Sequence, residues 1–275
     1  MTDKLRNVFY VSDGTGLTAE MLGETLISQF PETEFKRTII PYVKNESDAE
    51  NVVKKIKAIK NTTGDYPVVI STLVDDSLHL ILSESGAVIF DLFATFIEPL
   101  ETILNSHSVH KKGRMHGVAD SDRYHHRVRA LEYSLSHDDG LSHTSLEKAD
   151  LIITGVSRCG KTPTALYMAM QFSLRAANYP LIQEDLEKEK LPDVLKPFKN
   201  KLIGLNIKSE QLSLYRQERR ANSTYASLKQ CKKEIQQALN IFESEDIPYL
   251  DTSSVSIEEI ATRIVQKVNL HRPGY

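Results

Sequence analysis

Eight consecutive residues near the middle of the chain read Gly155-Val156-Ser157-Arg158-Cys159-Gly160-Lys161-Thr162. They fit the phosphate-binding pattern G-x-x-x-x-G-K-S/T, the P-loop, at every specified position. An apolar run from Leu151 to Thr154 precedes them and predicts a strand, and a helical pattern from Thr164 to Arg175 follows them. Because strand, loop and helix come in the required order, the sequence predicts a P-loop here rather than a chance match.

Each residue type in this loop has a physical reason. Glycines let the backbone curl so that successive N–H groups converge on phosphate oxygens, and the helix N-terminus adds partial positive charge. Lys161 is a candidate catalytic residue because its ammonium can reach a phosphoryl group in transfer, and Thr162 can offer its hydroxyl to Mg²⁺. Arg158 can add charge-assisted bonds to a second anion. The predicted nucleotide- and phosphate-binding residues are Gly155, Val156, Ser157, Arg158, Cys159, Gly160, Lys161 and Thr162.

The first hundred residues alternate strand and helix patterns. Alternation of this kind favours a parallel sheet with helices on both faces, so residues 1–104 are predicted to form a Rossmann-like N-terminal α/β domain. Ser47 with Glu50 forms a capping-box signature that opens one of its helices. Strands are expected at 8–11, 38–43, 67–73 and 87–90, and other helices at 17–30 and 77–82.

A second α/β unit, residues 146–275, contains the P-loop and is predicted to be a kinase-like phosphotransferase domain. Its later strands are expected at 179–182, 201–207 and 247–250, and Ser256 with Glu259 caps a closing helix. Residues 105–145 are interpreted as a connecting segment, polar at first and then helical over about 123–135. The predicted fold class is therefore α/β, with two units in one chain.

The connecting segment ends in His137-Asp138-Asp139-Gly140. A histidine or carboxylate here could be a general base that takes a hydroxyl proton, so His137 and Asp138 are candidate catalytic residues. Asp139 is a candidate Mg²⁺ ligand together with Thr162. The alternative interpretation is a helix C-cap with left-handed Gly140 and solvated acids.

Three arginines downstream, Arg216, Arg219 and Arg220, have spacings that place them on one helical face. They are a candidate second anion site that closes over phosphates, since the arginine fork suits phosphate oxygens. The alternative is a solvated basic face with Glu218 as partner.

Composition excludes several other classes. A formal net charge of −3 gives no global attraction to nucleic acid or to anionic lipid, and no apolar run approaches the length of a membrane span. Two cysteines and an N-terminus without an apolar core favour a soluble, cytoplasmic protein. No N-K-x-D motif follows the P-loop, which argues against a GTPase, and no apolar strand ending in Asp offers a Walker B carboxylate.

Several separate motifs, in one order along nearly the whole chain, resemble those of the bacterial regulatory proteins of phosphoenolpyruvate synthetase and of pyruvate, phosphate dikinase. The matching stretches are Val11-Ser12-Asp13-Gly14-Thr15 with Thr18-Ala19-Glu20, Ser136-His137-Asp138-Asp139-Gly140, the loop continued through Pro163-Thr164, Ala176-Ala177-Asn178-Tyr179-Pro180, Glu218-Arg219-Arg220 with Asn222-Ser223, and Tyr225-Ala226-Ser227.

The resemblance implies a bifunctional enzyme. One activity of that family transfers a phosphoryl group from ADP to a threonine beside the target's catalytic histidine, releases AMP and inactivates the target. The other removes the group by attack of inorganic phosphate, releases pyrophosphate and restores the target. The implied ligands are ADP and inorganic phosphate, with Mg²⁺ expected from the loop, and the implied partner is phosphoenolpyruvate synthetase. Cys159-Gly160 resembles the synthetase branch, because the dikinase branch typically carries Thr-Ser there.

The residues themselves leave alternatives open. The same activities could act on pyruvate, phosphate dikinase, or the chain could be a small-molecule or nucleotide kinase that needs no protein partner. A non-catalytic nucleotide sensor is the third hypothesis. Nothing in the residues distinguishes ADP from ATP as donor, and a homodimer is a hypothesis that no stretch of sequence specifies.

Overall fold

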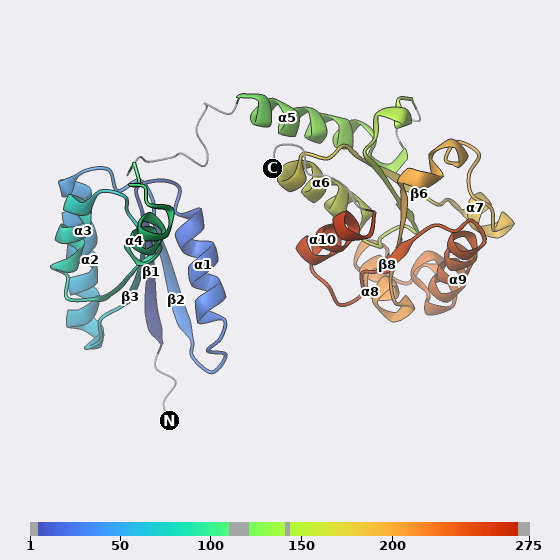
Figure 1. Ribbon diagram of the computed structural model, residues 1–275. Helices are drawn as coiled ribbons and strands as arrows, with labels where there is room; N and C mark the ends of the chain where they lie inside the picture. Colours follow the sequence, from blue (N-terminus) through green and yellow to red (C-terminus); the bar gives the residue numbers. More distant parts are fainter. Residues whose placement is uncertain (1–4, 110–120, 141–143, 269–275) are drawn as a thin grey trace. The chain divides into compact units, whose positions relative to one another are not determined.

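The computed structural model describes residues 5–109, 121–140 and 144–268, and the chain divides into two compact units, 1–117 and 118–275 (Figure 1). Each unit contains one four-stranded parallel sheet with helices, which confirms the predicted α/β class. The helix expected inside the connecting segment 105–145 lies in the second unit. Residues 110–120 and 141–143 of that segment lie outside the described residues.

The first unit alternates strands and helices throughout. Its elements are β1 (Arg6–Ser12), α1 (Leu17–Ile27), β2 (Phe35–Ile40), α2 (Glu46–Thr63), β3 (Val68–Thr72), α3 (Asp76–Ser83), β4 (Val88–Asp91) and α4 (Leu92–Leu104). The strand order is β2-β1-β3-β4.

Both faces of this first sheet bury apolar side chains, because successive residues of a strand point to opposite faces. Phe9 and Val11 of β1 join a core cluster with residues of α2 and α3. Val8 and Tyr10 join a second cluster with residues of α1 and with Leu92 at the start of α4. Helices on both faces explain why the strands carry nearly continuous apolar runs.

The second unit begins with α5 (Ser121–Ser136) and two short 3₁₀ turns, η1 (Asp138–Gly140) and η2 (Leu146–Lys148). Its sheet has the order β6-β5-β7-β8, the same order as in the first unit. The further elements are β5 (Leu151–Gly155), α6 (Lys161–Phe172), β6 (Ala176–Pro180), α7 (Gln183–Lys188), η3 (Lys196–Lys201), β7 (Leu202–Asn206), α8 (Ser209–Arg219), η4 (Thr224–Ala226), α9 (Leu228–Ser244), β8 (Tyr249–Asp251) and α10 (Ile257–Lys267).

The strand order explains where a site can form in the second unit. All five residues of β5 are buried in the middle of the sheet, with β6 on one side and β7 on the other. The chain leaves β5 toward β6 and later crosses back to β7, so the order reverses at the carboxyl end of β5. Crevices at such reversal points are the usual ligand sites of open parallel sheets.

Three predicted boundaries were wrong. The second strand of the second unit spans 176–180 instead of 179–182, because Ala176 and Ala177 are small buried residues without a typical strand signal. The strand expected at 38–43 spans 35–40. The cap of α2 is Asn45, whose side chain accepts the Asp48 N–H, rather than Ser47.

The structure also contains a helix, α4, that the sequence pattern did not reveal. Leu92 is its one buried residue, whereas Phe96, Leu100 and Ile103 are exposed. The cap of the closing helix is as predicted, since the Ser256 hydroxyl accepts the Glu259 N–H.

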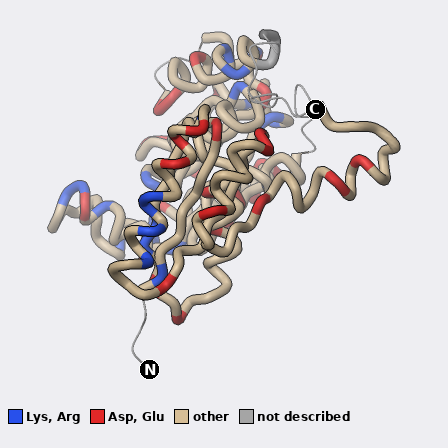
Figure 2. Tube along the Cα trace, turned by 90° about the vertical axis from the view of Figure 1, so that its left-hand side faces the viewer, with Lys and Arg blue, Asp and Glu red and all other residues tan. Residues whose placement is uncertain are grey.

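Acidic and basic residues are interspersed along the trace, in keeping with the small formal net charge of −3 (Figure 2). None of the helices in the described part of the chain combines the length and hydrophobicity that crossing a bilayer requires.

Candidate active site at the end of strand β5

The loop between β5 and α6 turns on two glycines with left-handed or unusual backbone. Gly155 has φ 148°, and a Cβ at this position would lie 2.4 Å from the Leu205 carbonyl oxygen, so only glycine fits beside β7. Gly160 has φ 94° and directly precedes the first turn of α6. The loop therefore folds back over the N-terminus of α6, where free N–H groups and the helix dipole can hold an anion.

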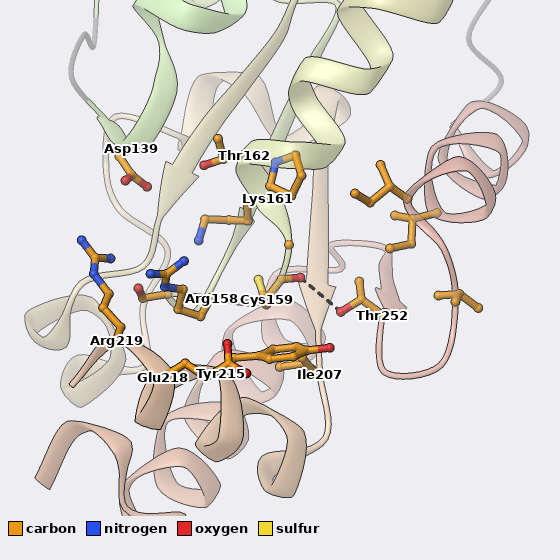
Figure 3. A pocket seen from close by; sticks show the side chains of 16 residues that line it. Asp139, Arg158, Cys159, Lys161, Thr162, Ile207, Tyr215, Glu218, Arg219 and Thr252 are labelled. Atoms are coloured by element: carbon orange, nitrogen blue, oxygen red, sulfur yellow. Dashed lines mark hydrogen bonds between the residues drawn. The ribbon is translucent and has the colours of Figure 1, made fainter. Parts of the chain in front are cut away.

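Lys161 is held in this loop rather than extended into solvent. Its side chain is 4% exposed, and its Nζ donates to the Val156 carbonyl oxygen at 2.9 Å. Lys161 lines a cavity of about 740 Å³ and reaches into the space between Asp139 and Arg158 (Figure 3). A buried ammonium beside converging N–H groups can stabilise negative charge more strongly than one in water.

The cavity has a polar side and an apolar side. Arg158, Arg219 and Asp139 stand on the polar side together with Lys161 (Figure 3). The apolar wall consists of side chains just after β7, in α8 and in or near α10: Ile207, Tyr215, Val255, Ile257 and Ile260. Such a cavity suits a ligand with a charged end and a flat or apolar end.

Asp138 and Thr162 meet above the loop. The Thr162 hydroxyl donates to Asp138 Oδ1 at 2.9 Å, which joins the 3₁₀ turn η1 to the first turn of α6. The predicted P-loop threonine thus lies against one of the two predicted acids. Asp139, its neighbour, lines the cavity and has φ 49°, so the backbone bends sharply at this position.

Asn178, in the strand next to β5, completes this cluster. Its Nδ2 donates to Asp138 Oδ1 at 2.6 Å and to Thr162 Oγ1 at 2.9 Å, and Asp139 Oδ1 lies 3.4 Å away. The sequence interpretation did not assign Asn178 a role. The signal was present in the motif Ala176 to Pro180, but an asparagine after two alanines does not resemble the expected strand ending in aspartate.

His137 takes part in the fold of this segment instead of facing the cavity. Its ring is buried and stacks on Tyr133 with centroids 3.9 Å apart. Nδ1 lies 2.9 Å from the Tyr133 carbonyl oxygen, and Nε2 lies 2.8 Å from the Thr144 carbonyl oxygen. Both ring nitrogens of His137 therefore contact backbone carbonyl oxygens. Burial also raises the pKa of the stacked Tyr133 to about 12, so its phenol stays protonated.

Of the three predicted arginines, only Arg219 lines the cavity. Arg216 is fully buried: it forms an ion pair with Glu234 at 2.6 Å, its guanidinium lies over the Tyr225 ring, and its Nη2 donates to the Ser157 carbonyl oxygen at 3.2 Å. Arg219 lines the cavity, whereas Arg220 is exposed at the C-cap of α8. The arginines that share the cavity are therefore Arg219 and Arg158 of the loop.

Cys159 and Ser157 are fixed from outside the loop. The Thr252 hydroxyl lies 3.1 Å from the Cys159 carbonyl oxygen (Figure 3), and the Tyr225 hydroxyl donates to Ser157 Oγ at 3.0 Å. Burial raises the pKa of the Cys159 thiol, which keeps it protonated and unreactive. These contacts describe a loop that is shaped before any ligand binds.

The residues fit a magnesium ion bound together with phosphates. In the described part of the chain, no group of three or more His, Cys, Asp or Glu side chains could hold a metal alone. Mg²⁺ does not require such a cage, because it usually keeps several waters and binds one or two carboxylates plus phosphate oxygens. The Thr162 hydroxyl is one predicted ligand that would hold it here. Asp138, which that hydroxyl contacts, is in a better position than the predicted Asp139 to be the carboxylate beside it.

Comparison with known proteins identifies the family to which this protein belongs. The family model described as kinase/pyrophosphorylase matches residues 8–265, so the chain belongs to this family.

Relatives match over almost their whole length. Proteins named "Putative phosphoenolpyruvate synthase regulatory protein" are 46% identical in Legionella pneumophila (strain Lens), over 97% of this chain and 98% of that one, and 48% identical in Azoarcus sp. (strain BH72), over 98% of both. A protein of the same name in Acinetobacter baylyi is 47% identical over 97% of this chain and 96% of its own length. Among solved structures, an ABC transporter solute-binding protein from Conexibacter woesei aligns over 98% of both chains, but its TM-score of 0.20 and identity of 11% are too low to inform the fold.

Proposed function

We propose that this protein is a bifunctional regulator of phosphoenolpyruvate synthetase. Its forward activity transfers the terminal phosphoryl group of ADP to a threonine of the synthetase, and its second activity removes that group with inorganic phosphate. The observation that carries the proposal is the contact between Thr162 and Asp138 at the end of the loop, in a chain of the kinase/pyrophosphorylase family. The names of the relatives supply the proposed protein substrate.

The cavity supports ADP as the ligand. In the proposed complex, residues 155–162 form a P-loop that binds the diphosphate, and Lys161 neutralises charge on the group in transfer. The apolar wall that includes Ile207, Val255 and Ile257 offers a surface for the adenine ring. Mg²⁺, when bound, would neutralise phosphate charge next to Thr162 and Asp138.

The forward step needs a base for the acceptor hydroxyl. The threonine oxygen attacks the terminal phosphorus of ADP, a new P–O bond forms, and the bond from that phosphorus to the bridging oxygen breaks, which releases AMP. The hydroxyl proton passes to Asp138, whose carboxylate faces the loop. The two ring nitrogens of His137 already contact the backbone carbonyl oxygens of Tyr133 and Thr144. We therefore assign His137 a structural role in this segment and no role in proton transfer.

The second activity uses two anions at once. An oxygen of inorganic phosphate attacks the phosphothreonine phosphorus, the bond to the threonine oxygen breaks, that oxygen takes up a proton, and pyrophosphate leaves. The attacking phosphate needs cationic partners beside the loop. Arg158 and Arg219, which line the cavity, are the proposed partners.

A direct assay tests the proposal. Phosphoenolpyruvate synthetase and pyruvate, phosphate dikinase would be incubated side by side with the protein and β-³²P-labelled ADP, and AMP and phosphothreonine would be measured. We expect label on the synthetase and its release as pyrophosphate after phosphate is added. Label on the dikinase alone would assign the other target. Transfer to a small acceptor without either protein would indicate a small-molecule kinase, and nucleotide binding without any transfer would indicate a sensor.

A further inference from the structure

The orientation of the Asn178 side chain is determined by its neighbours. Its Nδ2 donates to Asp138 Oδ1 at 2.6 Å and to Thr162 Oγ1 at 2.9 Å, with Asp139 Oδ1 farther away at 3.4 Å. Rotating the amide by 180° would set its carbonyl oxygen against a carboxylate oxygen with no proton between them. The donor end of Asn178 therefore faces the site.

Counting protons then shows what remains available at the site. The Thr162 hydroxyl gives its single proton to Asp138 and uses one lone pair for Asn178, so one lone pair remains. Asp138 Oδ1 accepts two donors, whereas Oδ2 takes no hydrogen bond from the described residues. The arrangement leaves one oxygen on each side chain for a cation or a proton.

Stability of the fold does not explain an asparagine at this position. Asn178 is 1% exposed although its strand, β6, is at the edge of the sheet, and its Oδ1 has no hydrogen-bond partner among the described residues. An unpaired buried carbonyl oxygen destabilises a protein, and a leucine of similar size would avoid that cost. The amide must therefore contribute something other than packing.

We propose that Asn178 is a positioning residue that locks the Asp138 carboxylate and the Thr162 hydroxyl together, so that both present a free oxygen to the Mg²⁺ of the bound nucleotide. It stands on the strand next to β5, where the sequence lacks the expected aspartate, and supplies the orientation while Asp138 supplies the charge. The inference rests on the proposed nucleotide function but not on the identity of the protein substrate.

Asn178→Leu tests this proposal with a control that loses a similar bond elsewhere. The control is Asn240→Leu. Asn240 lies on α9, and its Nδ2 also donates to a carboxylate, that of Glu189, at 2.9 Å. Calorimetry would measure ADP affinity with and without Mg²⁺, and steady-state assays would measure kcat and KM. We expect Asn178→Leu to melt at a temperature no lower than the wild type and to keep the wild-type ADP affinity without Mg²⁺. The gain in affinity from Mg²⁺ and the kcat should each fall about ten- to a hundredfold, the usual size for groups that orient metal ligands.

Two results would overturn the proposal. One is a folded Asn178→Leu protein with wild-type Mg²⁺ dependence and kcat, and the other is a wild-type protein whose ADP affinity does not depend on Mg²⁺. If Asn178→Leu does not fold, Asn178→Ala carries the same measurements with a smaller side chain. Should the wild type fail to phosphorylate the synthetase, the proposed substrate is wrong, while Mg²⁺-dependent ADP binding still decides the role of Asn178.

Discussion

At the scale of single residues, the loop shows what sequence alone can predict. Gly155, Gly160 and Lys161 each follow from a local requirement: a close approach to a neighbouring strand, a left-handed turn and a charge at a helix N-terminus. Asn178 could not be predicted in this way, because its role depends on partners 40 and 16 positions away along the chain. Only the folded sheet brings these residues together.

Replacing Lys161 by alanine should strongly slow phosphoryl transfer in both directions. The ammonium is buried beside the loop, and losing one charge-stabilising contact of this type costs about 3–4 kcal/mol, a factor of about 100 to 1000 in rate. Single-turnover assays with labelled ADP and with phosphorylated target would measure the loss. Lys190→Ala, at an exposed lysine of the same unit, is the control and should leave both rates unchanged. Full activity of Lys161→Ala would place the site elsewhere.

Asp138→Asn should impair the forward reaction more than the phosphate-dependent one. An amide cannot accept the threonine proton, whereas inorganic phosphate carries protons of its own that can reach the leaving threonine oxygen. Rates in both directions, compared with Asp193→Asn at an exposed surface acid, would show the asymmetry. Because Asp138 is also a proposed Mg²⁺ ligand, both rates should fall, and equal losses would show that it does not act as the base for the threonine hydroxyl.

Neither cysteine should react with thiol reagents in the folded protein. Burial raises the pKa of both Cys159 and Cys231, so at pH 8 the reactive thiolate fraction is smaller than for a free cysteine. A chromogenic disulfide reagent should titrate no thiol in the native state and both in denaturant. A fast-reacting thiol at pH 8 in native protein would contradict the burial of the loop.

At the scale of elements, helix α8 shows how spacing can predict a shared face but not its environment. The sequence correctly suggests that Arg216 and Arg219 belong to one helix. It cannot show that α9 supplies Glu234, which draws Arg216 into the core, while Arg219 stays at the cavity. The two arginines therefore serve different purposes: one supports the loop and the other faces the ligand space.

Arg216→Met should destabilise the second unit. Removing the arginine leaves Glu234, 15% exposed, without its partner and frees the Ser157 carbonyl oxygen. Breaking a buried pair costs about 3–5 kcal/mol, and the residual exposure of Glu234 favours the lower end, about 3 kcal/mol. Urea denaturation followed by circular dichroism would measure it. Arg220→Ala, at an exposed position, should change stability by less than about 0.5 kcal/mol. Equal stability of the Arg216 variant and wild type would refute the supporting role.

At the scale of the whole molecule, the alternation of strands and helices was sufficient to predict two α/β units. The domain limits, at 104 and 146, remain predictions, and the structure divides into compact units of residues 1–117 and 118–275. Helix α5 is the reason for the difference, because it packs on α6 and thus joins the second unit. A polar helix gives no sign in its sequence of which sheet it will cover.

A fragment of residues 118–275 should bind ADP as the full chain does. Every residue that lines the cavity lies between Asp139 and Ile260, inside this unit. Calorimetry on the fragment and on the full chain should give dissociation constants within about threefold, a difference under about 0.7 kcal/mol. Lys161→Ala in the fragment is the control for specific binding. A folded fragment that no longer binds ADP would mean that the first unit contributes to the nucleotide site.

The acid that touches the loop precedes it in the gene. Asp138 stands 24 positions before Thr162, so a search for an acidic partner only downstream of the loop would miss it. The fold brings the two residues together through η1 and the first turn of α6. Annotation of distant homologues should therefore search upstream as well.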